Sequence, residues 1–315
     1  MAAEQRPACT KTFTLNNGPG VSLDDETVVK SIVHGLKSGY RLIDTAQLYG
    51  NEPLVGEAVR TCGVARSDIT VVTKFPGWYH GDPSAALDVS LKALGLDYID
   101  VFMMHWPISE TPTSPPQPLR PDQSPTFVEA WKKMETLVGP RCKSIGVSNF
   151  TQKTLETLLE TATIVPAVNQ VELHAFNPNL KLVPYCQSKG IHVMSWRTLG
   201  GLGTPDGPLG NGLFVDIGKA HDCSPAVVSL SWAVQRGVSV IPKSIHYGRI
   251  EDNIKLVTLA DDEMIRINAV HEKIGKFRIA DYIPALQLEV DGKPTIRGWS
   301  KVELGWEDAQ GNWLT

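Results

Sequence analysis

The sequence has few cysteines, no long apolar run and no strong excess of either charge. Its five cysteines, at positions 9, 62, 142, 186 and 223, are an odd number without close pairing. This usage is typical of a reducing compartment and argues against a disulfide framework. No run of about 18 apolar residues occurs, and "MAAEQRPACT" lacks the basic and apolar pattern of a signal peptide. We therefore expect a cytoplasmic protein without a transmembrane helix.

Other absences exclude further classes of protein. The formal net charge is −4, so the chain has no broad electrostatic attraction for nucleic acid or anionic membranes. It contains no G-x-G-x-x-G, P-loop or H-E-x-x-H motif. The segment "GLGTPD" resembles G-x-G-x-x-G but has Asp in place of the last glycine. No dense His/Cys cluster has the spacing of a zinc site. We expect neither a Rossmann fold nor a bound metal.

Short, apolar, β-branched runs are present, and segments with helical periodicity separate them. The runs are "YRLIDTA", "DITVVTKF", "YIDVFMMHW", "CKSIGVS", "AVNQVEL", "IHVMSWR" and "VSVIPKS". Continuously apolar strands that alternate with helices predict a parallel sheet covered on both faces. Seven such strands nearly fill a (β/α)8 TIM barrel, which typically takes about 250 residues. We predict one α/β barrel domain over residues 1–315.

The start of the chain is short for such a barrel. Ser22 and Asp25 resemble a capping box at the beginning of a helix that ends before Gly39. An eighth strand must therefore precede Ser22, where only "TFTLNNGPG" is available. Two further segments break the repeat, namely the proline-rich stretch 107–126 and a tail over about 275–315. Loops that follow barrel strands overhang the active-site face, so we expect substrate specificity in these two segments and in the loop 200–213.

Polar residues stand at the ends of three successive predicted strands. Asp44, Lys74 and His105 end these strands, and Tyr49 follows Asp44 closely. In a closed barrel these ends converge on one rim, so Lys74 is expected to meet Asp44 beside the tyrosine. A nearby ammonium lowers the pKa of a phenol from about 10, which makes Tyr49 a usable proton donor. The alternative is that each residue is only a satisfied polar group at a strand end.

A second polar cluster follows the last predicted strand. Lys243 and Ser244 end that strand, and Arg249 comes one loop later. Loops after the last two barrel strands commonly hold phosphate, and an arginine can bind phosphate bidentately. A solvated basic loop is the alternative. Trp78 and Trp106 are expected to line an apolar substrate pocket, or else to pack at the top of the barrel.

Together these residues resemble the aldo-keto reductase family. "YRLIDTAQLYGNE" is similar to the family signature that carries the catalytic Asp and Tyr, "VVTKF" carries the Lys and "MMHWP" the His. The resemblance implies reduction of an aldehyde or ketone by NADPH in a monomeric barrel without metal, with Tyr49 as general acid. It also implies the residues that bind the cofactor: Ser148, Asn149, Gln170, Trp196, Leu199, Lys243, Ser244, Arg249 and Asn253.

Three features depart from the family pattern. Trp196 stands where a tyrosine usually stacks on the nicotinamide ring, and Arg197 is bulkier and more charged than the usual residue. About a dozen residues of the N-terminal hairpin and first strand are missing, so either "TFTL" serves as the first strand or the barrel is incomplete. A non-enzymatic NADPH-binding regulatory module, or an impaired variant with a truncated first strand, is therefore the alternative function.

Overall fold

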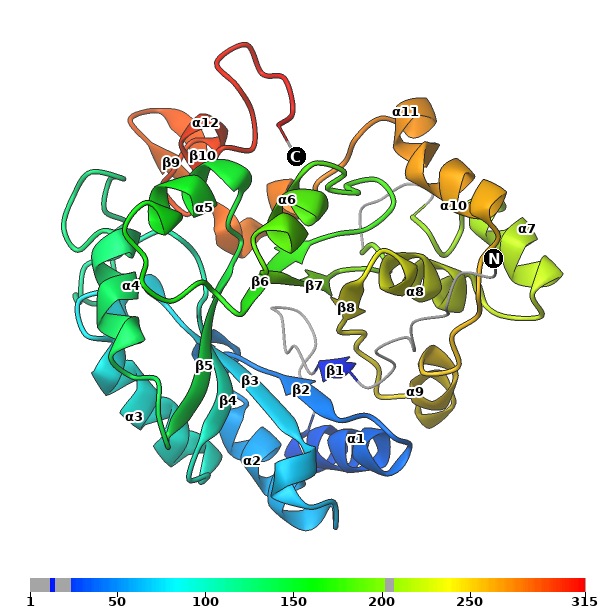
Figure 1. Cartoon of the computed structure of the whole chain (residues 1–315), viewed down its shortest axis with the longest axis horizontal. Coiled ribbons are helices and arrows are strands. Elements are labelled where there is room, and N and C mark those ends of the chain that lie inside the picture. Colours follow the sequence, from blue (N-terminus) through cyan, green and yellow to red (C-terminus); the bar gives the residue numbers. More distant parts are fainter. Residues whose placement is uncertain (1–11, 15–23, 202–206, 315) are drawn as a thin grey trace.

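Eight parallel strands form one curved sheet around the centre of the molecule (Figure 1). The computed structural model describes residues 12–14, 24–201 and 207–314. The strands are β1 (Thr12–Thr14), β2 (Leu42–Asp44), β3 (Thr70–Phe75), β4 (Ile99–Met104), β5 (Cys142–Ser148), β6 (Val168–Glu172), β7 (His192–Trp196) and β8 (Val238–Val240). Each strand pairs with the next along the chain in parallel. The predicted α/β barrel architecture is confirmed, and all seven predicted runs contain a strand.

The short N-terminal stretch does provide the first strand. Thr12 and Thr14 pair with Leu42 and Asp44 of β2, so "TFT" takes the place of a longer strand. β1 lies between β2 and β8 (Figure 1). Within the described residues, however, no ladder of strand pairs joins β8 to β1. The barrel therefore has a seam at this place.

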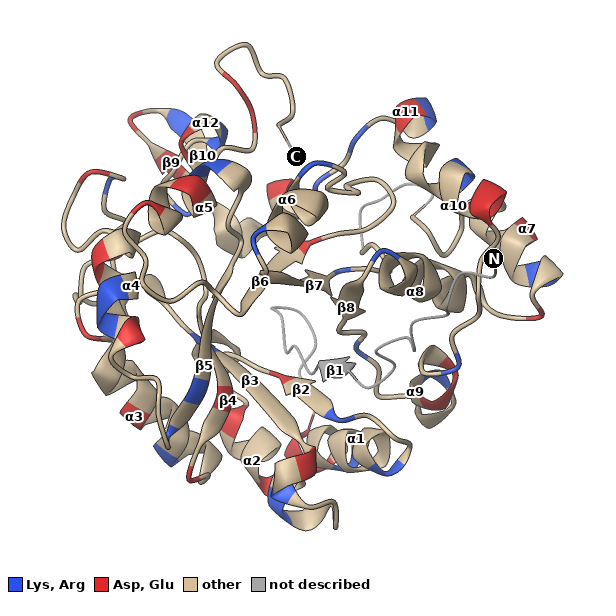
Figure 2. Cartoon of the chain, in the orientation of Figure 1, with Lys and Arg blue, Asp and Glu red and all other residues tan. Residues whose placement is uncertain are grey.

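Helices cover the outside of the sheet. They are α1 (Asp25–Lys37), α2 (Glu52–Thr61), α3 (Pro83–Leu94), α4 (Phe127–Glu135), α5 (Gln152–Leu159), α6 (Leu182–Ser188), α7 (Gly212–Ala220), α8 (Pro225–Gln235), α9 (Tyr247–Asn253), α10 (Asp261–Asn268), α11 (Val270–Ile274) and α12 (Lys301–Leu304). Val28, Ile32 and Leu36 of α1 are buried, as the apolar stripe requires. Figure 2 shows that charged residues lie mainly on these outer helices.

One predicted helix start is wrong. The cap of α1 is Asp24, whose carboxylate accepts a hydrogen bond from the Thr27 N–H at 2.8 Å. Asp25 is therefore the first helical residue and not the third, which the predicted capping box needed. Ser22, the other half of that prediction, lies outside the described residues.

The core has two parts that follow from this architecture. One lies between the sheet and the helices. The other fills the inside of the barrel and consists of Val72, Val101, Met103, Val168, Met194 and Ile241. A filled interior leaves the rim at the carboxyl ends of the strands as the place for a site. No helix in the described part of the chain is long and apolar enough to cross a membrane.

The tail beyond α11 folds back over that rim. It contains the hairpin of β9 (Gln287–Val290) and β10 (Lys293–Ile296), followed by α12. Arg297 forms an ion pair with Glu110 at 2.5 Å, and the Trp299 indole donates to the Leu119 carbonyl at 2.7 Å. The tail therefore packs directly on the proline-rich loop 107–126.

Candidate active site

A buried ion pair lies at the carboxyl ends of β2 and β3. The Lys74 ammonium donates to both carboxylate oxygens of Asp44 at 2.7 Å, and to the Thr45 carbonyl at 2.9 Å. Asp44 and Lys74 have no solvent-exposed surface. Burial lowers the pKa of Lys74, while the Asp44 carboxylate opposes this shift. The structure therefore contains the predicted contact between Lys74 and Asp44.

Gln170, on a strand distant in sequence, also contacts this ion pair. The Gln170 amide of β6 donates to Asp44 Oδ1 at 2.6 Å. Asp44 therefore accepts hydrogen bonds from Lys74 and Gln170 together, and a buried carboxylate needs such partners. Gln170 was expected to bind cofactor, whereas the described contact ties it to the ion pair.

Tyr49 lies beside this pair, on the short helix η1 (Gln47–Tyr49). The Lys74 ammonium is 5.3 Å from the centroid of the Tyr49 ring. The ring of His105, which directly follows β4, meets the Tyr49 ring edge to face with centroids 5.6 Å apart. The four predicted catalytic residues are therefore gathered in one place, although they come from separate strand ends.

The acid strength of Tyr49 differs from the prediction. Burial raises the pKa of the Tyr49 phenol well above its ordinary value, and the Asp44 carboxylate raises it further. Arg197 acts in the opposite direction but does not reverse the shift. The prediction that Lys74 lowers this pKa is therefore wrong, because burial and the Asp44 carboxylate raise it. At neutral pH the phenol therefore holds its proton.

His105 is neutral in this environment. Burial lowers the pKa of its imidazole well below the ordinary value, and the charges of Lys74 and Arg297 lower it further. The Nδ1 atom of His105 is buried and has no hydrogen-bond partner within the described residues. The uncharged ring can act as a hydrogen-bond donor or acceptor toward a ligand beside Tyr49.

Asn149 connects this group to β7. Its amide donates to the His105 carbonyl at 2.9 Å, and its Oδ1 accepts from the Trp196 indole N–H at 3.0 Å. Asn149 has φ of 64°, a left-handed conformation that asparagine tolerates better than most residues. The neighbouring Ser148 hydroxyl donates to the Gln170 carbonyl at 2.9 Å. Trp196 is half-buried, and the contact with Asn149 fixes the direction of its ring.

The residues expected at the phosphate end follow β8, the strand beyond β1 from β2. Lys243 and Arg249 are exposed, whereas Ser244 and Asn253 are buried. The Ser244 hydroxyl accepts from the His246 N–H at 3.0 Å, and Arg249 and Asn253 belong to α9. Within the described part of the chain, the Arg249 guanidinium has no hydrogen bond or ion pair. It is therefore available to an anion.

Sequence reasoning gave no role to two further charged residues near the site. Arg197 follows β7 with φ of 59° and is exposed. Its charge opposes the rise in the pKa of Tyr49 and adds to the lowering that burial causes in the pKa of Lys243. Glu52 is buried and accepts from the Thr73 hydroxyl at 2.6 Å. Only its position on α2, one turn beyond Tyr49, could have indicated it from sequence.

The expected substrate-pocket residues lie at the same rim. Trp106 directly follows His105, is buried and packs near Trp306 of the tail, with ring centroids 6.2 Å apart. Trp78 is half-buried on the short helix η3 (Gly77–Tyr79). Leu199, expected at the cofactor, is partly buried against the core. Residues 202–206 of the predicted specificity loop 200–213 lie outside the described residues.

The described residues contain no group of three or more His, Cys, Asp or Glu side chains that could hold a metal ion. The site contains a protonated phenol, a neutral imidazole and a buried ion pair, and the exposed cation Arg249 lies on α9 after β8. Such a set can donate a proton to an oxygen atom and bind an anionic group some distance away.

Known proteins share both the sequence and the fold of this chain. A model of the aldo/keto reductase family matches residues 12–272. A D-galacturonate reductase of Hypocrea jecorina is 39% identical over 282 residues, which cover 82% of this chain and 89% of that protein. A glycerol 2-dehydrogenase (NADP(+)) of Saccharomyces cerevisiae is 37% identical, with 86% of this chain and 94% of that protein covered.

Solved structures agree with these relatives. The aldose reductase of Giardia lamblia has a TM-score of 0.76 and 31% identity, over 85% of this chain and 93% of that chain. The aldose reductase of Schistosoma japonicum has a TM-score of 0.73 and 32% identity, over 83% and 88% respectively. With its ion pair, phenol and imidazole at the rim of an eight-stranded parallel sheet, the chain belongs to the aldo/keto reductase family.

Proposed function

We propose that this protein reduces an aldehyde or ketone to the alcohol, with NADPH as the hydride donor and Tyr49 as the proton donor. One observation carries the proposal. The protonated phenol of Tyr49 lies against the neutral ring of His105 and next to Lys74, at the mouth of a filled barrel. A carbonyl oxygen held by the phenol and the imidazole would be polarised before the proton moves.

The residues of the site fit a nicotinamide dinucleotide. Trp196 offers an indole face whose direction Asn149 fixes, and Asn149 and Ser148 offer polar groups for a carboxamide. Arg249 and Lys243 are exposed cations in the segment that follows β8, and a phosphate group requires such charges. When bound, the cofactor supplies the hydride.

Each step of the chain's own chemistry follows from these contacts. Tyr49 donates its proton to the oxygen of the carbonyl group as negative charge develops there. Lys74 and Asp44 keep a charged pair beside the phenol, and Gln170 holds Asp44 in place. His105 orients the same oxygen, and its lowered pKa keeps it uncharged at neutral pH.

The relatives indicate which carbonyl compounds to try first. Proteins named D-galacturonate reductase and D/L-glyceraldehyde reductase, both from Hypocrea jecorina, match this chain at 39% and 35% identity. We propose a small hydroxylated aldehyde, ketone or sugar acid as substrate. The test is loss of NADPH absorbance with D-galacturonate, D/L-glyceraldehyde and an aromatic aldehyde. Tight NADPH binding without turnover on the whole panel would favour the regulatory module.

We also infer that the protein is a cytoplasmic monomer. Cys62, Cys142, Cys186 and Cys223 are free thiols, which suits a reducing compartment. The sheet buries its core within one chain. Light scattering coupled to gel filtration tests the monomer, and a dimer mass would contradict it.

A further inference from the structure

Glu172 is a buried carboxylate that the proposed chemistry does not use. It is the last residue of β6, two positions after Gln170, and only 5% of it is exposed. Its neighbour across the ladder is Trp196. A carboxylate at such a depth is costly to bury unless several donors meet it.

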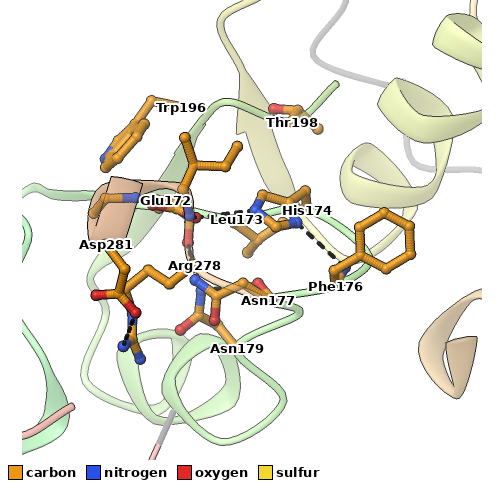
Figure 3. Close-up of polar contacts among 12 residues, drawn as sticks. Glu172, Leu173, His174, Phe176, Asn177, Asn179, Trp196, Thr198, Arg278 and Asp281 are labelled. Carbon is orange, nitrogen blue, oxygen red and sulfur yellow. Dashed lines mark hydrogen bonds and ion pairs between the residues drawn. The ribbon is translucent and has the colours of Figure 1, made fainter. Parts of the chain in front are cut away.

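Three donors converge on Glu172. The His174 Nε2 donates to Glu172 Oε1 at 3.0 Å, since His174 Nδ1 accepts from the Phe176 N–H at 3.3 Å and so carries no proton. The other two donors are backbone N–H groups of the tail, from Ile279 at 2.5 Å and Ala280 at 2.9 Å. Figure 3 shows Glu172 at the centre of this group, between His174 and the pair Arg278 and Asp281.

This contact fixes the tail where it first returns to the rim. Arg278 directly precedes the two backbone donors in the chain, and it is 2% exposed. Its guanidinium packs over the rings of Trp306 at 4.2 Å and Trp313 at 4.1 Å. The Glu172 contact therefore sets the position of Arg278, and Arg278 in turn supports Trp306.

Trp306, the last residue in this series of contacts, lies near residues of the candidate active site. Glu172, Arg278 and Trp306 line one cavity together with Asn149 and Trp196. Trp306 also packs near Trp106, which directly follows His105. A shift of the tail would therefore move Trp306 relative to Trp106, an expected substrate-pocket residue. The described hydrogen bonds of Asp44 and Lys74 do not involve the tail.

We propose that Glu172 is a positioning residue: its carboxylate latches residues 279–280 to the end of β6 and thereby sets the wall formed by Trp306 for substrate binding. The role rests on the proposed carbonyl reduction. Glu172 would act through the tail and not on the reacting atoms. Its loss should therefore weaken the binding of substrate much more than it slows the chemical step.

The test compares Glu172→Gln with Glu263→Gln. The amide keeps the shape but offers one acceptor oxygen to three donors. Glu263 of α10 is a matched control, because it too is buried and accepts hydrogen bonds from a histidine, His221 at 2.8 Å, and from a backbone N–H, that of Ala260 at 2.8 Å.

We expect KM for the carbonyl substrate to rise about tenfold in Glu172→Gln, the size of one lost charge-assisted hydrogen bond. We expect kcat and the Kd for NADPH to change less than about threefold, since the described hydrogen bonds of the Glu172 carboxylate go to His174 and the tail and not to Asn149 or Trp196. Hydrogen exchange of the amides at 279 and 280 should become faster. Glu263→Gln should alter none of these values.

Two results would overturn the proposal. Faster exchange at 279–280 with an unchanged KM would remove the positioning role, and unchanged exchange would remove the latch itself. Absence of turnover in the wild type would instead count against the proposed function, and the exchange measurement would still report on the latch. If Glu172→Gln does not fold, Glu172→Asp keeps the charge on a shorter side chain, and KM and exchange should shift in the same direction.

Discussion

Lys74 and Asp44 form a closed pair in which the ammonium donates to both carboxylate oxygens at 2.7 Å, with neither residue exposed to solvent. The positive charge of Lys74 is therefore paired directly with the carboxylate of Asp44. Burial of the phenol and the nearby Asp44 carboxylate raise the pKa of Tyr49, although the ammonium lies 5.3 Å from the ring centroid. The pair therefore provides a fixed polar group beside the phenol and does not promote ionisation of the phenol.

Replacing Tyr49 by phenylalanine should remove most turnover and leave cofactor binding nearly intact. Proton transfer by a positioned group contributes about 10²- to 10⁴-fold to the rate, so kcat should fall within that range. The Kd for NADPH should stay within about twofold, because the hydroxyl is not among the groups expected to hold the dinucleotide. Steady-state kinetics and calorimetry measure the two quantities. Tyr98→Phe is the control, since Tyr98 precedes β4 at the opposite end of the barrel. A Tyr49→Phe enzyme with the wild-type kcat would show that another group donates the proton.

Replacing Lys74 by methionine should abolish activity and also lower stability. Asp44 would be left as an uncompensated buried carboxylate, which typically costs about 3–5 kcal/mol. Chemical denaturation followed by tryptophan fluorescence gives the free energy of unfolding. The double variant Asp44→Asn with Lys74→Met should be less destabilised than Lys74→Met alone, because it removes the unpaired charge. Equal losses in the two variants would contradict this explanation.

Removing the Arg249 guanidinium should weaken NADPH far more than NADH. Each charge-assisted hydrogen bond contributes about 1.5–3 kcal/mol, so Arg249→Ala should raise the Kd for NADPH by about 10- to 100-fold or more. Binding of NADH should change little, because it lacks the 2′-phosphate. Lys255→Ala is a nearby control, since Lys255 is exposed and already paired with Asp252 at 3.1 Å. Similar losses for both cofactors would mean that Arg249 does not bind the 2′-phosphate.

The reductive reaction should depend little on pH between about 6.5 and 10, the ordinary pKa values of histidine and tyrosine. Tyr49 must carry a proton for the reaction, and its raised pKa keeps that proton in place throughout this range. His105 must be neutral, and its lowered pKa keeps it so. The profile of kcat/KM against pH measures this. A fall in kcat/KM centred below about pH 8 on the alkaline side would contradict the raised pKa.

Stability should fall in acid, and His80 should be one cause. Burial and the charge of Arg297 lower the pKa of His80 to about 3. An unfolded chain takes up a proton near pH 6.5, whereas the folded protein does so only near 3, so stability is complete above about pH 6.5 and is lost as the pH falls toward 3. His80→Asn can keep a hydrogen bond to Ser109 and should show a weaker dependence of Tm on pH. His246→Asn is the exposed control. An unchanged pH dependence in His80→Asn would rule out this contribution.

Local pattern was enough to locate the strands and the catalytic candidates. The run "CKSIGVS" coincides with β5, and Asp44 and Lys74 were placed at strand ends. Strand periodicity is a property of a few consecutive residues, and parallel strands bring their carboxyl ends to one rim. The start of α1 was missed because Asp24 competes with Ser22 as a cap, and both residue types suit that position.

Sequence alone was enough for the order of seven strands, the rim and the four catalytic candidates, Tyr49 among them. The first strand and the contacts among those candidates followed only from the folded structure. Gln170 reaches Asp44 across 126 positions of the chain, and the tail reaches Glu172 across 107. The pKa of Tyr49 likewise depends on burial and on the charges of Asp44 and Arg197, which folding brings near the phenol. Such effects arise from the packing of distant segments and the solvent that it excludes, which no local pattern records.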